Sequence, residues 1–180
     1  TARTAIFNWL FAQKQKGIFV MRVEDTDKER SKREFEEDIL EGFRWLGLTW
    51  DELYHQSERY EIYKKYLEKL LEEGKAFWCP HTKEELEQGG PLHRCSARDA
   101  NQANGELIRL KIPLGEKICF DDIIRGKICF ESDLLSDISL AKNLDTPLYN
   151  FAAVVDDHEM KISHVIRGED HISNTPKQIL

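Results

Sequence analysis

Polar, hydrogen-bonding side chains gather in two short stretches of the chain, each directly after an apolar run. The sequence RVEDTD supplies Arg22, Glu24, Asp25 and Asp27, and the sequence HVIRGEDH supplies Arg167, Glu169, Asp170 and His171. A guanidinium offers a planar fork of donors to a carboxylate, whereas carboxylates suit an ammonium group or ribose hydroxyls. If the two stretches meet, they form a bipolar pocket that matches an amino acid and a nucleotide.

A plainer interpretation stays open for these charged groups. Charged residues at strand ends often serve as helix caps or as surface ion pairs. However, burying unpaired charge is costly, so chains seldom place this many charges after apolar strands without partners or ligands. The residues alone therefore favour a small-molecule pocket without identifying its occupant.

Two cysteines and two histidines form a second candidate site. Cys79 and His81 stand one residue apart, as do His93 and Cys95, with eleven residues between the pairs. Zinc accepts two thiolates and two imidazoles in a tetrahedron. The gap within each pair is tighter than the common spacing of about two to four residues. The alternative is that Cys79 packs internally and both histidines face solvent.

The elements that would position the first stretch alternate as in an α/β layer. A helix is predicted over residues 4–16, because apolar residues recur at helical spacing and Gly17 can end it. The nearly continuous apolar run over residues 18–23 predicts a central parallel strand buried on both faces. In open α/β sheets the carboxyl ends of such strands face the ligand crevice. The charges after residue 21 are therefore predicted to line a crevice.

Two amphipathic helices are predicted after this strand. A capping box of Ser31 and Glu34 starts the first, which ends at Gly47. After a turn over residues 49–57, Ser57 is predicted to cap the second, which Gly74 ends. The residues predicted to face the core are Phe35, Ile39, Phe43 and Leu46 in the first helix, and Tyr63, Leu67, Leu70 and Leu71 in the second.

The pattern changes near residue 76, where we expect a domain boundary. A short capped helix from Thr82 and the breaker GGP at residues 89–91 come first. The tetrapeptide KICF then occurs twice in KICFDDIIRGKICF, which predicts a hairpin with Cys119 and Cys129 packed as small hydrophobic residues on one face. Residues 148–157 and 161–168 are predicted as strands, followed by a helix that starts at Thr175 and Pro176. The middle region is then an insertion into one sheet-based domain.

Composition excludes several classes of protein. The chain has 180 residues, 41% hydrophobic and 33% charged, which argues against disorder, and no apolar run is long enough to span a bilayer. A net charge of -7 does not favour indiscriminate nucleic-acid binding. The absence of a visible targeting segment, together with four cysteines that do not form a dense framework, predicts a cytoplasmic protein with reduced thiols.

Six stretches carry a resemblance to a known family. TARTAIFNWLFA, MRVEDTDKERS, WLGLTWDE, FDDIIRG, PLYNFAAVVDDHEM and SHVIRGEDHISNTPKQI follow one another along the chain. Their order resembles that of the signatures in the catalytic domain of bacterial-type glutamyl-tRNA synthetases, over nearly the whole chain. The resemblance implies a class I synthetase with a Rossmann-like α/β core, its first strand missing, and an inserted α+β acceptor-stem-binding domain. The implied boundaries are 1–75 and 146–180 for the catalytic domain and 76–145 for the insertion.

The resemblance also implies residue roles. Glu24 should meet the amino group of L-glutamate, and Arg167 its side-chain carboxylate. Tyr149 and Asn150 should line the same pocket. Asp170 and His171 should contact ATP, which enters as a substrate together with Mg²⁺. Glu169 should support these two residues. No residue of this chain is expected to be a covalent catalyst, and the terminal ribose of tRNA(Glu) should accept the glutamate.

The resemblance places two signatures of the family outside the chain. A HIGH-like motif should end before Thr1 and a KMSKS-like loop should follow Leu180, so the chain is expected to be a fragment that cannot activate glutamate alone. Two alternatives are a glutamyl-queuosine tRNA(Asp) synthetase, which EDTDKERS disfavours, and a non-catalytic nucleotide- or tRNA-binding module. Whether tRNA(Gln) is also charged is left open.

The resemblance bears on zinc and on tRNA as well. Some members of the family bind one structural Zn²⁺ through a Cys-x-Cys pair and a later pair. Here His81 stands where a cysteine is common and Ala97 where the last ligand would be, so His93 would have to substitute. The acceptor stem would need a basic patch, to which the insertion could contribute Lys111, Lys117, Arg125 and Lys127.

Overall fold

The computed structural model describes residues 2–26, 31–88, 92–99 and 104–180. Asp27 and the GGP breaker at 89–91 lie outside the described residues. The chain divides into two compact units. Unit 1 comprises Thr1–Tyr60 and Lys161–Glu169, and unit 2 comprises Glu61–Met160 and Asp170–Leu180. These units are not the three predicted domains, whose boundaries at 76 and 146 stay predictions.

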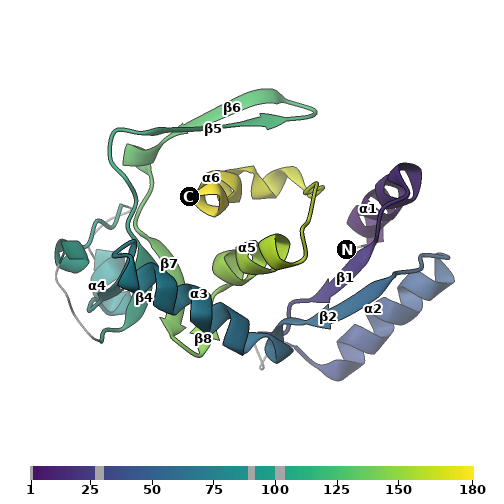
Figure 1. Cartoon of the computed structure of the whole chain (residues 1–180), viewed down its shortest axis with the longest axis horizontal. Coiled ribbons are helices and arrows are strands. Elements are labelled where there is room, and N and C mark those ends of the chain that lie inside the picture. Colours follow the sequence, from purple (N-terminus) through teal and green to yellow (C-terminus); the bar gives the residue numbers. More distant parts are fainter. Residues whose placement is uncertain (1, 27–30, 89–91, 100–103) are drawn as a thin grey trace. The chain divides into compact units, whose positions relative to one another are not determined.

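Unit 1 is built on a parallel strand pair with two helices. Its elements are α1 (Ala2–Gln15), β1 (Val20–Val23), α2 (Arg33–Trp45), β2 (Glu52–His55) and a 3-10 helix at Gln56–Glu58. Strands β1 and β2 lie side by side in Figure 1. They pair in parallel, with Val20 opposite Glu52 and Val23 opposite His55. The backbone N–H of Phe19 donates to Asp51 Oδ2 at 2.7 Å, and the Asp51 N–H donates to the Phe19 carbonyl at 2.9 Å.

Strand β2 corrects the prediction of a turn over residues 49–57. The sequence ELYH shows no apolar alternation, and its register with β1 comes from long-range backbone pairing instead. The prediction that the first strand is central and buried on both faces is also wrong for the described residues. All four β1 side chains are half-buried, and β1 pairs with β2 alone in the part of the chain that the structure describes.

Helix α2 lies where it was predicted, but its start and its buried face differ. Lys32 occupies the N-cap position without a side-chain cap hydrogen bond, so the Ser31–Glu34 capping box does not form. Leu40 and Phe43 are buried, whereas Phe35 is 57% and Ile39 43% exposed. Gly47, with φ of 73°, follows the helix as predicted, because a left-handed residue favours glycine.

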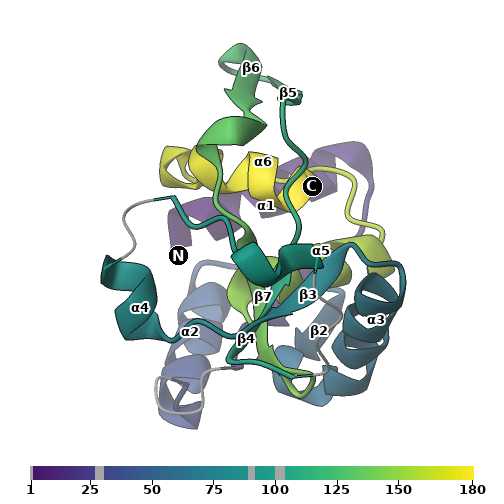
Figure 2. The same ribbon diagram turned by 90° about the vertical axis from the view of Figure 1, so that its left-hand side faces the viewer.

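Unit 2 contains an antiparallel sheet of four strands and a separate hairpin. The sheet has the order β3 (Ala76–Cys79), β4 (Leu107–Leu110), β7 (Ile138–Asn143) and β8 (Thr146–Pro147). The hairpin joins β5 (Lys117–Asp122) and β6 (Gly126–Glu131), with Cys119 opposite Cys129, as the repeat predicted. In both views the hairpin extends away from the sheet (Figure 1, Figure 2).

The helices of unit 2 are α3 (Tyr60–Glu72), α4 (Lys83–Gln88), α5 (Tyr149–Glu159) and α6 (Thr175–Ile179). Short 3-10 helices lie at Ser96–Asp99, Ser132–Leu134 and Glu169–Asn174. The buried Tyr63 of α3 donates its hydroxyl to Asp156 of α5 at 2.9 Å, which ties these two helices together in the core. Leu67 is buried beside Tyr63 on α3, as predicted, whereas Leu70 and Leu71 are half-buried.

Two predicted caps have different outcomes. Thr82 Oγ1 accepts the Glu85 N–H at 3.3 Å while Glu85 Oε2 accepts the Thr82 N–H at 2.8 Å, so the capped helix after Thr82 is confirmed. Ser57 does not cap the third helix, which begins at Tyr60. Its N–H and hydroxyl donate to Asp25 instead.

The predicted strand at 148–157 is wrong, because these residues form α5. Phe151, Ala152, Val155 and Asp156 are buried at spacings of three and four, which is a helical stripe. A short apolar run such as FAAVV does not distinguish a strand from a buried helix. The predicted strand over 161–168 is wrong as well, since those residues have no strand assignment. The helix that begins at Thr175 with an early proline is confirmed.

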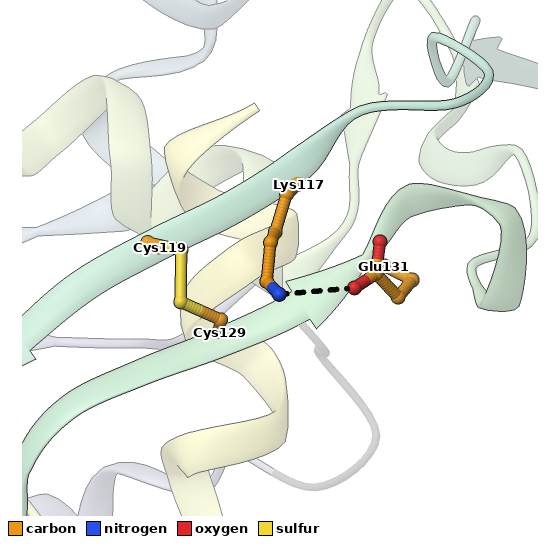
Figure 3. The surroundings of a disulfide bond; sticks show 4 residues. All are labelled: Lys117, Cys119, Cys129 and Glu131. Atoms are coloured by element: carbon orange, nitrogen blue, oxygen red, sulfur yellow. Dashed lines mark ion pairs between the residues drawn. A yellow bond between two sulfur atoms is a disulfide. The ribbon is translucent and has the colours of Figure 1, made fainter.

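The cysteines of the hairpin also differ from the prediction. Cys119 and Cys129 form a disulfide across the two strands (Figure 3), and Cys119 is exposed. Strand pairing places them directly opposite each other on the face that includes the exposed Lys117 and Glu131. They are therefore neither reduced thiols nor packed apolar residues. No described helix is both long enough and apolar enough to cross a membrane.

Candidate functional site

The loop after β1 carries the first group of predicted site residues. Arg22 lies in β1 and its Nη2 contacts Glu24 Oε1 at 3.5 Å, just beyond the strand. The Glu24 side chain is 38% exposed and the Arg22 side chain 18% exposed. Glu24 is therefore accessible at the carboxyl end of a parallel strand, where ligands of α/β sheets bind.

Asp25 has a structural role that the sequence did not indicate. Its Oδ1 accepts the Ser57 N–H at 2.9 Å and its Oδ2 accepts the Ser57 hydroxyl at 2.6 Å. These two bonds join the loop after β1 to the 3-10 helix after β2. Asp25 thus fixes the backbone next to Glu24.

Helix α1 anchors the segment that carries Arg167. Asn8 Nδ2 donates to the Ile166 carbonyl at 2.9 Å, and the rings of Phe11 and His164 lie 4.6 Å apart between centroids. Within the described residues the segment pairs with no strand, so these contacts hold the backbone directly before Arg167, whose side chain is half-buried. Glu24, Arg167 and Glu169 belong to unit 1.

The remaining predicted site residues belong to unit 2. Tyr149 and Asn150 start α5, and Tyr149 is 39% exposed. Gln178 Nε2 of α6 donates to Asn150 Oδ1 at 3.1 Å, which couples the two helices. Asp170 Oδ2 lies 3.6 Å from His171 Nε2, and the His171 Nδ1 lies 3.4 Å from Asn174 Nδ2. Helical turns therefore support Tyr149, Asn150 and His171 within this unit.

The four predicted metal ligands meet in unit 2. The donor atoms of Cys79, His81, His93 and Cys95 all lie within 4.8 Å of one another. Cys79 Sγ is 3.5 Å from both His81 Nδ1 and His93 Nε2, and Cys95 Sγ is 3.5 Å from His81 Nδ1. Both histidines are half-buried, and each ring contacts a cysteine sulfur, so the alternative in which both face solvent is not favoured.

These separations match a tetrahedral zinc centre. Zn–S bonds of about 2.3 Å and Zn–N bonds of about 2.0 Å at tetrahedral angles place sulfur and nitrogen about 3.5 Å apart. The donor set, two thiols and two imidazoles, also suits zinc better than a hard cation. The residues present therefore fit the metal.

Burial shapes the protonation of this cluster. Cys79 and Cys95 are 0% and 1% exposed. Burial raises the pKa of the Cys95 thiol to about 11. Burial also lowers the pKa of His93, with smaller contributions from the positive charge of Arg109 and from His81. Both shifts favour neutral ring and thiol forms in the absence of a cation.

Asp137 holds the second ligand pair in place, and sequence reasoning missed it. Its Oδ2 accepts the Cys95 N–H at 3.1 Å, its own N–H donates to the His93 carbonyl at 3.0 Å, and its Oδ1 accepts the Ile112 N–H at 3.1 Å. The neighbouring Ser136 hydroxyl accepts the His93 N–H at 3.0 Å. Asp137 lies 42 residues after Cys95, and no local pattern signals this contact.

Two of the four predicted basic residues are paired with acids. Lys111 Nζ lies 3.4 Å from Asp99 Oδ1, and Lys117 Nζ lies 3.4 Å from Glu131 Oε1. Lys127 is exposed and is the register partner of Asp121 in the hairpin. Acidic side chains therefore lie next to three of the four basic residues of the predicted patch and offset much of its positive charge.

Comparison with known sequences gives the family. The model for the catalytic domain of class I tRNA synthetases (E and Q) matches residues 1–180. The glutamate–tRNA ligase of Nitratidesulfovibrio vulgaris (strain DP4) is 47% identical over 191 residues, and that of Coprothermobacter proteolyticus is 51% identical over 199. Each alignment covers 99% of this chain, but only 41% and 43% of the relative. The chain thus spans less than half the length of these curated relatives.

Solved structures agree with the sequence comparison. A glutamate tRNA ligase from Elizabethkingia meningosepticum, crystallised in complex with its amino acid, matches with a TM-score of 0.89 at 35% identity. The glutamate-tRNA synthetase of Elizabethkingia anophelis gives the same TM-score and identity. The matches cover 99% of this chain and 42% and 43% of those chains. The architecture is that of an α/β class I catalytic domain with mixed sheets, and this chain belongs to the class I tRNA synthetases (E and Q).

Proposed function

We propose that this protein is a glutamate–tRNA ligase, which activates L-glutamate with ATP and transfers it to tRNA(Glu). The observation that carries the proposal is identity of 47% and 51% with glutamate–tRNA ligases along 99% of the chain. These names do not favour the alternative of a glutamyl-queuosine tRNA(Asp) synthetase or of a non-catalytic module. A cytoplasmic location, where tRNA is charged, is part of the proposal.

Recognition of glutamate is assigned to four residues. Glu24 meets the substrate ammonium group and Arg167 its side-chain carboxylate, with Tyr149 and Asn150 along the pocket. A guanidinium pairs with a carboxylate through two parallel hydrogen bonds, which an amide matches poorly. Arg167 therefore selects glutamate over glutamine. The exposure of Glu24 and the anchoring of Ile166 by Asn8 support these roles.

The chemistry needs positioning more than reactive side chains. The substrate α-carboxylate oxygen attacks the α-phosphorus of ATP, pyrophosphate leaves, and a ribose hydroxyl of the tRNA then attacks the adenylate carbonyl and releases AMP. Mg²⁺ bound with the ATP neutralises phosphate charge. Asp170 and His171 contact the nucleotide, and Glu169 supports them. The 3-10 helix that contains these three residues places Asn174 Nδ2 3.4 Å from His171 Nδ1, a contact that orients the His171 ring.

The substrate assignment is tested by ligand-dependent thermal stability. Glutamate should raise the melting temperature of the purified protein, and glutamine should not, because a ligand stabilises only the state that binds it. Arg167→Ala should abolish the shift. Arg33→Ala is the matched control, since Arg33 makes an exposed ion pair with Glu37 at 3.0 Å and should leave the shift unchanged. A full glutamate shift in Arg167→Ala contradicts the assigned role.

The insertion over residues 76–145 is proposed to hold one structural Zn²⁺ and to contact the acceptor stem. Cys79, His81, His93 and Cys95 would bind the metal and fix β3 to the 3-10 helix at Ser96–Asp99. Elemental analysis of the purified protein should find about one zinc per chain. Cys95→Ala should lose the zinc, whereas Cys119→Ser, which changes a cysteine outside the cluster, should keep it. A metal content near zero in the unmodified protein contradicts the site.

A further inference from the structure

The β5–β6 hairpin carries a disulfide on its solvent-facing side, and nothing in the ligase reaction uses it. Cys119 and Cys129 are directly opposite in the antiparallel ladder (Figure 3). The register puts Lys117, Asp121, Lys127 and Glu131 on the same face, because side chains alternate along a strand. All four of these residues are exposed. The sulfur atoms thus sit on the polar side of an amphipathic hairpin.

The opposite face of the hairpin supplies the packing. Ile118 is 6% exposed, and Phe120, Ile128 and Phe130 are half-buried. The rings of Phe120 and Phe130 are nearly parallel, at 8°, with centroids 6.4 Å apart. Strand β5 also contacts α6, beside which the hairpin lies in both views (Figure 1, Figure 2). Apolar contacts on this side hold the hairpin independently of the disulfide.

Further contacts hold the two ends of the hairpin. Lys117 Nζ pairs with Glu131 Oε1 at 3.4 Å beside the disulfide, as Figure 3 shows. At the turn, Asp122 Oδ1 accepts the N–H groups of Ile124 and Arg125, each at 2.8 Å. Gly126 adopts a φ of 74°, which suits the tight turn. None of these contacts involves the sulfur–sulfur bond, so they are available to align the strands without it.

We propose that Cys119 and Cys129 form a reversible thiol–disulfide modification site, which low-molecular-weight thiols reduce and low-molecular-weight disulfides restore without unfolding the protein. The two sulfur atoms stay next to each other in both states, because the ladder and the apolar face hold them there. This inference does not depend on the ligase activity.

The exchange follows from the difference in exposure between the two cysteines. A small-molecule thiolate attacks Sγ of Cys119, the more exposed of the two residues, the sulfur–sulfur bond breaks, and Cys129 Sγ leaves with the electron pair and takes up a proton. A second small-molecule thiolate then attacks the small-molecule sulfur of the mixed disulfide and releases Cys119 as a thiolate, which is protonated. Two small thiols are thereby oxidised to one disulfide while the protein gains two electrons and two protons.

The experiment is a redox titration of the purified, zinc-loaded protein with glutathione. Samples equilibrated over a range of reduced-to-oxidised ratios are alkylated at neutral pH without denaturant, and peptide mass spectrometry measures the free thiol at each cysteine. The Cys119–Cys129 pair should be reduced and re-oxidised with the same midpoint in both directions. Cys79 and Cys95, which are 0% and 1% exposed, serve as internal controls and should not be alkylated under native conditions.

Hydrogen exchange and circular dichroism separate a modification site from a structural cross-link. Reduction should leave the circular dichroism spectrum unchanged and accelerate amide exchange only in β5 and β6. The variant with both Cys119→Ser and Cys129→Ser should fold and melt no more than about 10 °C lower. Three results would each overturn the proposal. The pair is reduced only in denaturant, the two thiols fail to form a disulfide at any ratio of reduced to oxidised glutathione, or the fold is lost on reduction.

A matched pair of single variants tests the order of attack. In Cys129→Ser the remaining Cys119 should react with oxidised glutathione faster than Cys129 does in Cys119→Ser, because Cys119 is the more exposed. Equal rates, or a faster Cys129, would overturn the assignment of Cys119 as the attacked sulfur.

Discussion

The two carboxylates that follow β1, those of Glu24 and Asp25, have different roles. The Glu24 side chain is accessible, whereas Asp25 directs both oxygens to Ser57, at 2.9 Å and 2.6 Å. A carboxylate that accepts two hydrogen bonds fixes a loop, and an exposed one is available to bind a ligand. Of these two neighbouring residues, Asp25 therefore has a structural role and Glu24 has the proposed role in binding.

Removing the Asp25 carboxylate should destabilise unit 1. Asp25→Ala leaves the Ser57 N–H and hydroxyl without this acceptor, and a lost acceptor for a part-buried donor costs about 1–3 kcal/mol. Ser57→Ala keeps the backbone bond and should cost less. Urea denaturation of the two variants checks the order, and an equal or larger loss for Ser57→Ala would contradict it.

His55 and Glu36 should make the stability of unit 1 depend on pH. His55 Nε2 lies 2.8 Å from Glu36 Oε1, and this hydrogen bond raises the pKa of His55 against the opposing effect of burial. A raised folded-state pKa gives stability that is fully present below the unfolded value of 6.5 and is lost as the pH rises through the folded value.

Glu36→Gln is the variant that checks this dependence. Relative to the unmodified protein, it should lower the free energy of unfolding by up to about 1 kcal/mol at acidic pH, and by less at alkaline pH. Denaturation at both pH values measures the difference. The same loss at both values would show that protonated His55 is not stabilised by Glu36.

The sequence predicted the chemistry of individual residues better than their partners. The cluster of Cys79, His81, His93 and Cys95 was predictable from the types and spacing of these residues, since each pair is local in the chain, and zinc binding by the cluster stays a prediction. Asp137 could not be found, because its contact to Cys95 spans 42 residues. The disulfide was mispredicted because the alternation of KICF does not show which face meets solvent.

At the scale of elements, helices with clear stops were predictable and ambiguous apolar runs were not. Gly47 and Gly74, with φ of 73° and 66°, end α2 and α3 as expected. The run FAAVV was predicted as a strand, although Ala152 and Ala153 favour a helix intrinsically. Strand β2 was missed because its pairing with β1 is long-range and its own sequence is polar.

Asp137 should control both the stability of the region around the Cys79–Cys95 cluster and the affinity of the proposed site for zinc. Asp137 is 1% exposed, and its carboxylate accepts the N–H groups of Cys95 and Ile112 while Arg98 Nη2 lies 3.7 Å away. Asp137→Ala should destabilise the protein by at least about 2 kcal/mol, because it leaves the buried N–H groups of Cys95 and Ile112 without an acceptor.

Metal affinity is the second measurement for Asp137. Zinc should bind Asp137→Ala more weakly in a chelator competition, because the backbone of Cys95 is no longer held. Asp133→Ala is the matched control, since the exposed Asp133 accepts one N–H, from Gly115 at 2.9 Å, and lies outside the cluster. If Asp137→Ala binds zinc as tightly as the unmodified protein, Asp137 contributes to the stability of the fold and not to metal binding.

At the scale of the whole chain, acidic charge bears on the proposed binding of tRNA. The net charge is -7, and Lys111 and Lys117 are already paired with acids. Binding to a tRNA acceptor stem therefore requires a few local contacts to phosphates rather than a global field. The family assignment was predictable at this scale, because its motifs are spread over the whole chain, whereas the division into two units was not.

Salt dependence tests these local contacts. The affinity of the proposed ligase for tRNA(Glu) should fall with salt concentration, and Lys127→Ala should reduce the logarithmic slope by about 0.7–0.9 if Lys127 contacts a phosphate. Lys64→Ala, which removes an α3 lysine paired with Asp145, should leave the slope unchanged. Filter binding at several salt concentrations measures both. A slope unaltered by Lys127→Ala excludes this lysine from the contact.

The bond from Asn8 to the Ile166 carbonyl joins residues that are 158 positions apart. At about 5–20 residues per second, a ribosome needs roughly 8–30 s to make the intervening chain. Helix α1 therefore emerges long before the segment that it holds. During that delay its exposed apolar residues, Phe7 and Leu10, are a natural target for a chaperone that meets nascent chains.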